Sequence, residues 1–270
     1  MIAMWFRRVL LCIALGHAVL VVAHPGQHEQ LALINAQIER TPQLQALFIQ
    51  RGMLYSEGGQ FNEADADYRR ALELGPPEPV FFELGVLSYR MGKYEDATDY
   101  LTRYLDQFPD YPPAYDYLAR IARDQADYNS AVAYLRRYFR LQERPSPGHF
   151  ESAARMLAEQ QQYADALAVL DQGVAALGLI PQLQRHAIQL ELARGRPELA
   201  LARLETLRTM SRDSPDWKLD KADLLLQLGR AEEAVKLAQA AEEQLLSLKS
   251  TPARIELQRR AAELAQSPGG

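Results

Sequence analysis

The fold is decided by one stretch of the chain, FIQRGMLYSEGGQFNEADADYRRALELGP at residues 48–76. It places Ala64 three residues after an aromatic residue, Phe61. The same spacing returns at Tyr94/Ala97, Tyr128/Ala131, Tyr163/Ala166, Pro197/Ala200 and Ala231/Ala234. The six alanines are 33, 34, 35, 34 and 34 residues apart. A fixed period of about 20–50 residues is typical of repeat architectures, so the sequence predicts a stack of similar units.

The units are predicted to be helical hairpins. Leu, Ala, Glu, Gln and Arg dominate, whereas only 13 Val and Ile residues follow residue 23, which leaves little β-branched material for a sheet. Close helix crossings accept only small residues, and the predicted crossing pairs are Gly52/Ala64, Gly85/Ala97, Ala119/Ala131 and Ala154/Ala166. Proline is expected to end the second helix of several units, at Pro76, Pro109, Pro145, Pro181 and Pro215.

These motifs resemble the tetratricopeptide-repeat family. The first unit carries the family pattern at Phe48, Gly52, Tyr55, Gly59, Phe61, Ala64, Tyr68, Ala71 and Pro76. The resemblance implies an all-α, right-handed α-solenoid of six helical hairpins over residues 45–248. The expected units are 45–77, 78–111, 112–146, 147–180, 181–214 and 215–248. Residues 24–44 and 249–270 are expected to supply N- and C-terminal capping helices, the latter with a short tail.

The N-terminus has the pattern of a secretory signal peptide at residues 1–23. Arg7 and Arg8 precede an apolar run that ends at Ala23, where the sequence turns abruptly polar. Cleavage after Ala23 would leave 247 residues in the periplasm or outside the cell, with no membrane insertion of the mature chain. The alternative is an uncleaved anchor, although the run is shorter than the ~20 apolar residues that span a bilayer comfortably.

The composition argues against several function classes. The 270-residue chain is 48% hydrophobic and 24% charged, as expected for a folded globular protein. A net charge of −5 gives no broad basic surface, so no nucleic-acid partner is expected. The one cysteine, Cys12, lies in the leader, so the mature chain has none. Phosphate-binding glycine loops, His-Glu-x-x-His helices and nucleophile elbows are missing from the sequence, which predicts a non-catalytic protein without a cofactor.

Two histidines offer an alternative function. After cleavage, the amine and imidazole of His24, together with His28, could bind copper or zinc, since neutral imidazole is a good ligand for both metals. This alternative makes the chain a metal-handling or enzyme-accessory protein of the cell envelope. The other interpretation is that both histidines belong to an ordinary exported N-terminus that binds no metal.

The resemblance implies a partner-binding surface on the concave side, formed by the first helix of each hairpin. The family's groove positions correspond here to Phe82, Val86, Tyr89, Arg90, Arg120, Arg123, Arg155 and Arg185. The apolar members are expected to take apolar side chains of a protein or peptide partner, and the arginines an acidic or carboxylate-bearing segment. The alternative is that Asp116, Asp124, Glu151 and Glu159 neutralise the arginines within the chain.

Overall fold

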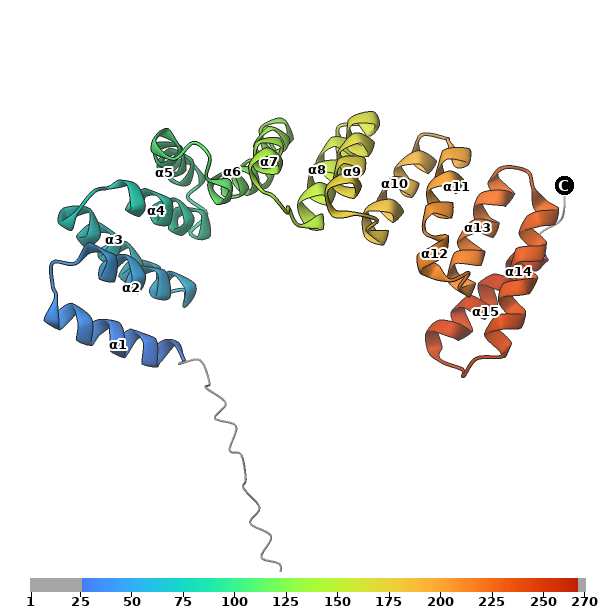
Figure 1. The fold of residues 1–270 in the computed structure, drawn as a ribbon, viewed down its shortest axis with the longest axis horizontal. Helices are drawn as coiled ribbons and strands as arrows, with labels where there is room; N and C mark the ends of the chain where they lie inside the picture. Colours follow the sequence, from blue (N-terminus) through green and yellow to red (C-terminus); the bar gives the residue numbers. More distant parts are fainter. Residues whose placement is uncertain (1–25, 267–270) are drawn as a thin grey trace, which may run out of the picture. The chain divides into compact units, whose positions relative to one another are not determined.

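The structure is a computed structural model that describes residues 26–266 (Figure 1). The predicted signal peptide at residues 1–23 and His24 therefore lie outside the described residues. Within residues 26–266 the regular secondary structure is helical throughout, which confirms the all-α prediction. The helices are α1 (Gln27–Arg40), α2 (Gln45–Glu57), α3 (Phe61–Leu74), α4 (Glu78–Arg90), α5 (Tyr94–Gln107), α6 (Pro112–Asp124), α7 (Tyr128–Leu141), α8 (Pro147–Glu159), α9 (Tyr163–Leu177), α10 (Pro181–Ala193), α11 (Pro197–Thr206), α12 (Arg208–Ser211), α13 (Pro215–Gln227), α14 (Ala231–Leu246) and α15 (Pro252–Ala265).

The chain divides into two compact units, the first ending at Gly75 and the second beginning at Pro76. In the first unit, α2 packs against both α1 and α3. In the second unit, the hairpins are α4/α5, α6/α7, α8/α9, α10/α11 and α13/α14, and α15 packs against α13 and α14 (Figure 1). These tandem hairpins with a helix at each end form the α-solenoid that the sequence predicts. The residue limits of the six repeat units stay a prediction.

The repeated alanine marks the second helix of every hairpin. Each of these helices begins at the residue three positions before its alanine: Phe61, Tyr94, Tyr128, Tyr163, Pro197 and Ala231. All six alanines are fully buried, with relative exposures of 0%. Two positions before each helix start, the backbone is left-handed, at Gly59, Gly92, Ala126, Gln161, Gly195 and Gly229. Ala126, at φ +59°, adopts this conformation without the freedom that glycine has, because the hairpin turn requires it.

The close crossings involve larger neighbours than the sequence predicts. A Cβ atom on Gly52 would lie 2.5 Å from Cε1 of Tyr68, and one on Gly85 would lie 2.7 Å from Cγ of Leu101. Tyr68 and Leu101 are each one helical turn beyond the alanine predicted as the crossing partner. The small residue therefore makes room for a large side chain, and at Gly85 the carbonyl oxygen of Ala97 is also close, at 3.4 Å from the added Cβ, as the predicted Gly85/Ala97 pairing requires.

Several prolines begin helices rather than end them. Pro181 and Pro215, predicted as terminators, occupy the first positions of α10 and α13, where a missing N–H costs no intrahelical hydrogen bond. The helix before Pro181 ends earlier, at Leu177, where Gly178 adopts φ +83°.

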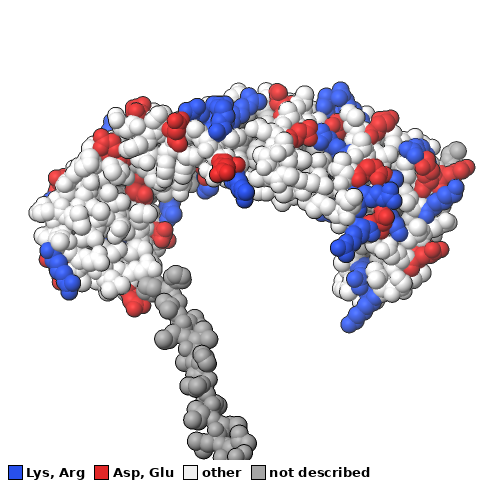
Figure 2. Space-filling model, in the orientation of Figure 1, with Lys and Arg blue, Asp and Glu red and all other residues white. Residues whose placement is uncertain are grey.

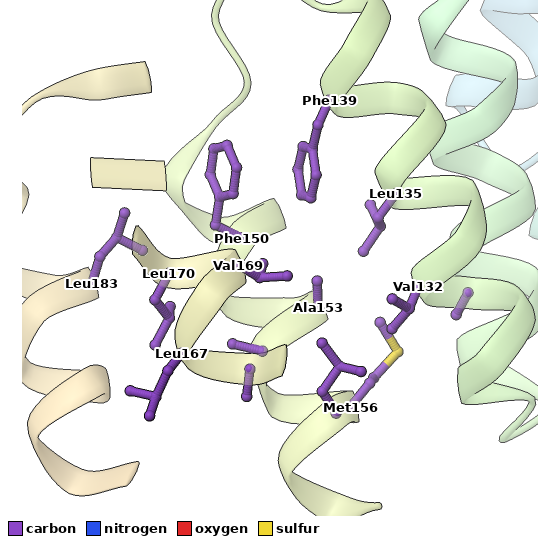
Figure 3. Packing of buried hydrophobic residues seen from close by; sticks show 14 of the residues in the cluster. Val132, Leu135, Phe139, Phe150, Ala153, Met156, Leu167, Val169, Leu170 and Leu183 are labelled. Atoms are coloured by element: carbon purple, nitrogen blue, oxygen red, sulfur yellow. The ribbon is translucent and has the colours of Figure 1, made fainter. Parts of the chain in front are cut away.

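Buried side chains join successive hairpins of the second unit. Phe139 of α7 stacks on Phe150 of α8, with ring centroids 4.2 Å apart and planes inclined by 10°. Leu135 and Val169 lie near them, and Val132 and Leu170 belong to the same buried cluster (Figure 3). This core fixes the relative positions of α6, α7 and α8, which carry most of the cavity described below.

The fifth hairpin is irregular. Its second helix, α11, has 10 residues, and the one-turn helix α12 follows before α13 begins. Arg212 and Asp213 adopt left-handed φ values of +50° and +51° in the connection. The four earlier second helices have 14 or 15 residues. The path of the chain between α11 and α13 therefore differs from that in the other hairpins.

Among the described helices, none combines the length and the apolar character that a membrane crossing requires.

Candidate functional site

A polar cavity of about 310 Å³ opens where α4, α6 and α8 of the second unit approach one another. Most of its lining comes from these three first helices, which the hairpin repeat places in succession. The lining residues are Tyr89, Asp116, Ala119, Arg120, Arg123, Leu135, Ser146, Gly148, His149, Ser152 and Met156.

Asp116 organises one wall of the cavity. Its carboxylate accepts from Nη2 of Arg120 at 2.7 Å and contacts Nε2 of His149 at 3.0 Å. Burial by itself raises the pKa of Asp116, but the hydrogen bonds from His149 and Arg120 outweigh it, so the pKa lies below its usual value. Asp116 is therefore an ionised group that holds Arg120 and His149 in place.

Asp124, at the end of α6, binds two other lining residues in a similar way. It accepts from Nε and Nη2 of Arg123 at 3.0 and 2.8 Å, and from the hydroxyl of Tyr89 at 3.0 Å. Burial and this hydrogen bond raise the pKa of Tyr89, so the phenol stays protonated at neutral pH. Arg123 and Tyr89, which belong to different hairpins, are thus fixed by one carboxylate.

The two arginines keep hydrogen-bond donors free for a bound group. A guanidinium carries five N–H donors, and each aspartate engages only part of that set. The side chains of Arg120 and Arg123 are 44% and 45% exposed, so their remaining donors are accessible from the cavity. The ring of His149 lies 4.5 Å from that of Tyr138 with the planes inclined by 42°, and its Nδ1 atom is buried without a hydrogen-bond partner among the described residues. The cavity is therefore rich in oriented donors.

The structure brings together three of the eight predicted binding residues: Tyr89, Arg120 and Arg123. Arg90 and Arg155 are exposed and make no ion pair with a described residue. Arg185 lies at another cavity, with its Nη2 atom 3.8 Å from Asp216. Their predicted role in binding stays a prediction.

Phe82 and Val86 do not line the cavity, and their role as contacts for a partner's apolar side chains stays a prediction. Val86 is only 7% exposed. The ring of Phe82 is half-buried among tyrosines, with centroid distances of 5.4 Å to Tyr104, 5.1 Å to Tyr111 and 6.0 Å to Tyr117. Both side chains pack within the second unit. Of the carboxylates expected to neutralise the arginines, Asp116 and Asp124 pair with Arg120 and Arg123, whereas Glu151 accepts from Gln182 at 2.7 Å.

His149, Ser146 and Ser152 were not predicted as site residues. His149 lies 33 residues after Asp116, whereas α6 and α8 begin 35 residues apart, so His149 is two positions nearer the start of its helix than Asp116 is. A search for polar pairs about one repeat apart, with an offset of two residues allowed, would have found this contact. The two serines carry no such signal, because small hydroxyl residues are frequent at helix starts.

No group of three or more His, Cys, Asp or Glu within residues 26–266 has the arrangement of a metal site. His28 is described, but its predicted partner, His24, lies outside the described residues, so the metal-binding alternative stays a prediction.

Known proteins support the repeat architecture. Two models of the tetratricopeptide repeat match residues 49–112 and 191–246. The C-terminal part of a TPR repeat-containing protein from Cytophaga hutchinsonii is similar, with a TM-score of 0.64 and 14% identity over 86% of this chain and 94% of that chain. PilF of Pseudomonas aeruginosa gives a TM-score of 0.54 and 17% identity over 73% of this chain and 90% of that chain. No curated protein matches the sequence at a significant level.

Tandem helical hairpins with close crossings define an all-α repeat protein. The chain carries tetratricopeptide repeats, because repeat models match two of its stretches, and solved repeat proteins share its fold. Proteins of this family generally act as scaffolds for protein–protein interaction.

Proposed function

We propose that the chain is a non-catalytic scaffold of the cell envelope that binds an acidic or carboxylate-bearing segment of a protein partner in the cavity between α4, α6 and α8. The observation that carries the proposal is the pair of arginines, Arg120 and Arg123, held at the cavity by separate aspartates. Guanidinium and carboxylate match in shape and charge, and such charge-assisted bonds are stronger than neutral ones.

The orientation of the arginines favours binding. Asp116 and Asp124 already restrict Arg120 and Arg123, so a ligand would not have to order both long side chains from a freely rotating state. The aspartates also lower the net positive charge of the cavity. Recognition would therefore depend on the direction of the N–H donors and on the hydroxyl group of Ser152 as well as on charge.

Replacing Arg120 and Arg123 together by glutamine should weaken binding of an acidic peptide at least tenfold, which equals ~1.4 kcal/mol. The probe is a fluorescein-labelled ten-residue peptide of alternating Glu and Ser with a free C-terminus, and fluorescence anisotropy gives Kd. Binding by the unaltered chain should weaken as salt is added, whereas the residual binding of the variant should depend less on salt.

The matched control is the double variant Arg90→Gln/Arg155→Gln. It removes the same charge from predicted groove positions that do not line the cavity. We expect its Kd to change less than threefold, with both variants keeping the thermal midpoint of the parent within a few degrees. Equal weakening by the two variants would mean that binding follows the charge of the whole surface rather than the cavity.

The proposed location rests on the N-terminal sequence. Arg7, Arg8 and the apolar run to Ala23 should direct export, with cleavage after Ala23. Edman sequencing of the natively exported chain should begin at His24. A start at Met1, or retention of the full chain in carbonate-washed membranes, would contradict export with processing.

A further inference from the structure

We infer that the second unit has another binding site, a groove between α10 and α13, which accepts apolar side chains of a partner segment that also carries a cationic residue. The groove shares no lining residue with the cavity around Arg120. The inference goes beyond the proposed function, since the chemistry of the ligand is the opposite of that expected at the first cavity.

The irregular fifth hairpin borders this groove. One cavity, of about 550 Å³, lies among α10, α13, α15 and Leu204 near the end of α11. An adjoining cavity of about 200 Å³ reaches α12 and shares Arg185, Leu204 and Asp220 with the first. The two spaces are therefore neighbouring parts of one groove. Its larger part has the size of common ligand sites, which range over about 300–1,000 Å³.

Apolar side chains form much of the groove lining. They come from four helices and the connection between them: Ile188, Leu192, Leu204, Leu207, Met210, Trp217, Leu224 and Leu226. Met210 of α12 is 52% exposed. Methionine adapts its shape to different apolar partners. The groove therefore offers apolar surface that the chain itself leaves partly uncovered.

Carboxylates line the rim of the groove. Asp216, Asp220 and Asp223 share one side of α13, because residues three and four apart lie on the same helical face. Two arginines face them: Arg260 of α15 donates to Asp220 at 2.9 Å and also to Asp223, and Arg185 lies 3.8 Å from Asp216. Three carboxylates thus share two guanidinium groups, which leaves the rim with one uncompensated negative charge.

At Asp220 the nearby arginines do not fully offset burial and repulsion. Burial raises the pKa of Asp220, and repulsion by Asp216 adds to this, whereas the hydrogen bond from Arg260 and the charges of Arg260 and Arg185 act against them, and the pKa stays above its usual value. The two lysines of α13 have other partners: Lys218 donates to Gln244 at 2.9 Å, and Lys221 pairs with Glu205. Figure 2 shows acidic and basic side chains closely intermixed over the C-terminal helices, so this charge balance is local.

These observations indicate one class of ligand for the groove: a short amphipathic protein segment whose apolar residues are next to Lys or Arg. The apolar side chains would cover Ile188, Leu192 and Met210. The cation would approach Asp216 and Asp220 at the rim. An acidic segment, the proposed ligand of the first cavity, would be repelled by the same carboxylates.

Trp217 provides a direct test, because it lines the groove and is the one tryptophan after residue 23. The probes are two twelve-residue peptides with identical leucine positions, one with lysines and one with glutamates between them. Titration of the full chain with the lysine peptide should change the Trp217 emission and give a Kd at least tenfold lower than the glutamate peptide. The Trp217→Phe variant measures the background from Trp5.

Variants separate the groove from the rest of the surface. Ile188→Ser should weaken binding of the lysine peptide at least fivefold, whereas Leu199→Ser should leave it within twofold, because Leu199 is an exposed leucine of α11 outside both parts of the groove. Asp216→Asn should reduce the preference for lysine over glutamate. The double variant Arg120→Gln/Arg123→Gln should bind the lysine peptide normally. A loss of binding in the groove can therefore be distinguished from a loss of binding in the cavity around Arg120.

Three results would overturn the inference. The first is an unchanged Trp217 emission at saturating lysine peptide, and the second is equal weakening by Ile188→Ser and Leu199→Ser. The third is concentration-dependent dimerisation of the free chain, measured by sedimentation velocity and abolished by Ile188→Ser. That result would assign the groove to a second copy of the chain.

Discussion

Replacing Arg51 with methionine is expected to lower the free energy of unfolding of the first unit by about 3–5 kcal/mol. Arg51 of α2 donates to both carboxylate oxygens of Asp67 on α3, at 2.8 and 2.6 Å, and to Asn35 of α1 at 2.7 Å. The side chain of Asp67 is only 7% exposed. Without the guanidinium, a buried carboxylate would lose its partner, and three helices would lose a shared contact. Urea denaturation, with hydrogen exchange of α1–α3, measures the change.

Two controls isolate the buried pair. Arg69→Met removes an arginine from an exposed pair with Asp65, and we expect a loss of at most about 1 kcal/mol. The double variant Arg51→Met/Asp67→Leu removes both charges and should recover most of the lost stability, because apolar residues often replace a buried ion pair without a net cost. If Arg51→Met and Arg69→Met had the same unfolding free energy, the pair would not hold the unit together.

Replacing Phe150 with alanine should destabilise the second unit by about 3–5 kcal/mol, as large-to-small changes of buried aromatic residues do. Phe150 has a relative exposure of 0% and stacks on Phe139 across the junction of two hairpins (Figure 3). Its ring also lies against Gly173 of α9, where an added Cβ would come within 2.9 Å of the ring. The cavity left behind would therefore border three helices. Urea denaturation followed by circular dichroism measures the loss.

Phe108→Ala is the matched control, because Phe108 is 45% exposed while still contacting the ring of Tyr104. It should cost about 0.5–1.5 kcal/mol, the usual value of an aromatic pair. Hydrogen exchange should show the loss from Phe150→Ala concentrated in α7, α8 and α9, since repeat units interact mainly with their neighbours. Equal costs for Phe150→Ala and Phe108→Ala would contradict the packing described for the core.

The sequence predicts the hairpins well because their geometry repeats. Ala64 and its five equivalents mark a position where only a small side chain fits, so the period of the alanines predicts where each second helix begins. The fold class follows from that period together with the scarcity of β-branched residues. Proline is ambiguous, since the same residue stops one helix and begins the next, and Pro181 and Pro215 do the latter.

The candidate site is harder to predict from sequence. Repeat positions predict which residues share a surface, and three of the eight predicted residues line the cavity. They do not predict which side chains pack inward, as Val86 does, because that depends on the size of neighbours in other helices. The groove near Met210 was missed entirely, since it depends on α12 and the left-handed residues Arg212 and Asp213, which break the repeat.

The central claim is that an acidic segment binds between α4, α6 and α8, and cross-linking tests it most directly. The Glu/Ser peptide used above would carry one benzophenone group, and mass spectrometry would locate its attachment to the full chain. We predict attachment to cavity residues, with Met156 and Tyr89 foremost, and its loss in Arg120→Gln/Arg123→Gln. Attachment that persists in that variant, or that falls mainly outside α4, α6 and α8, would contradict the account.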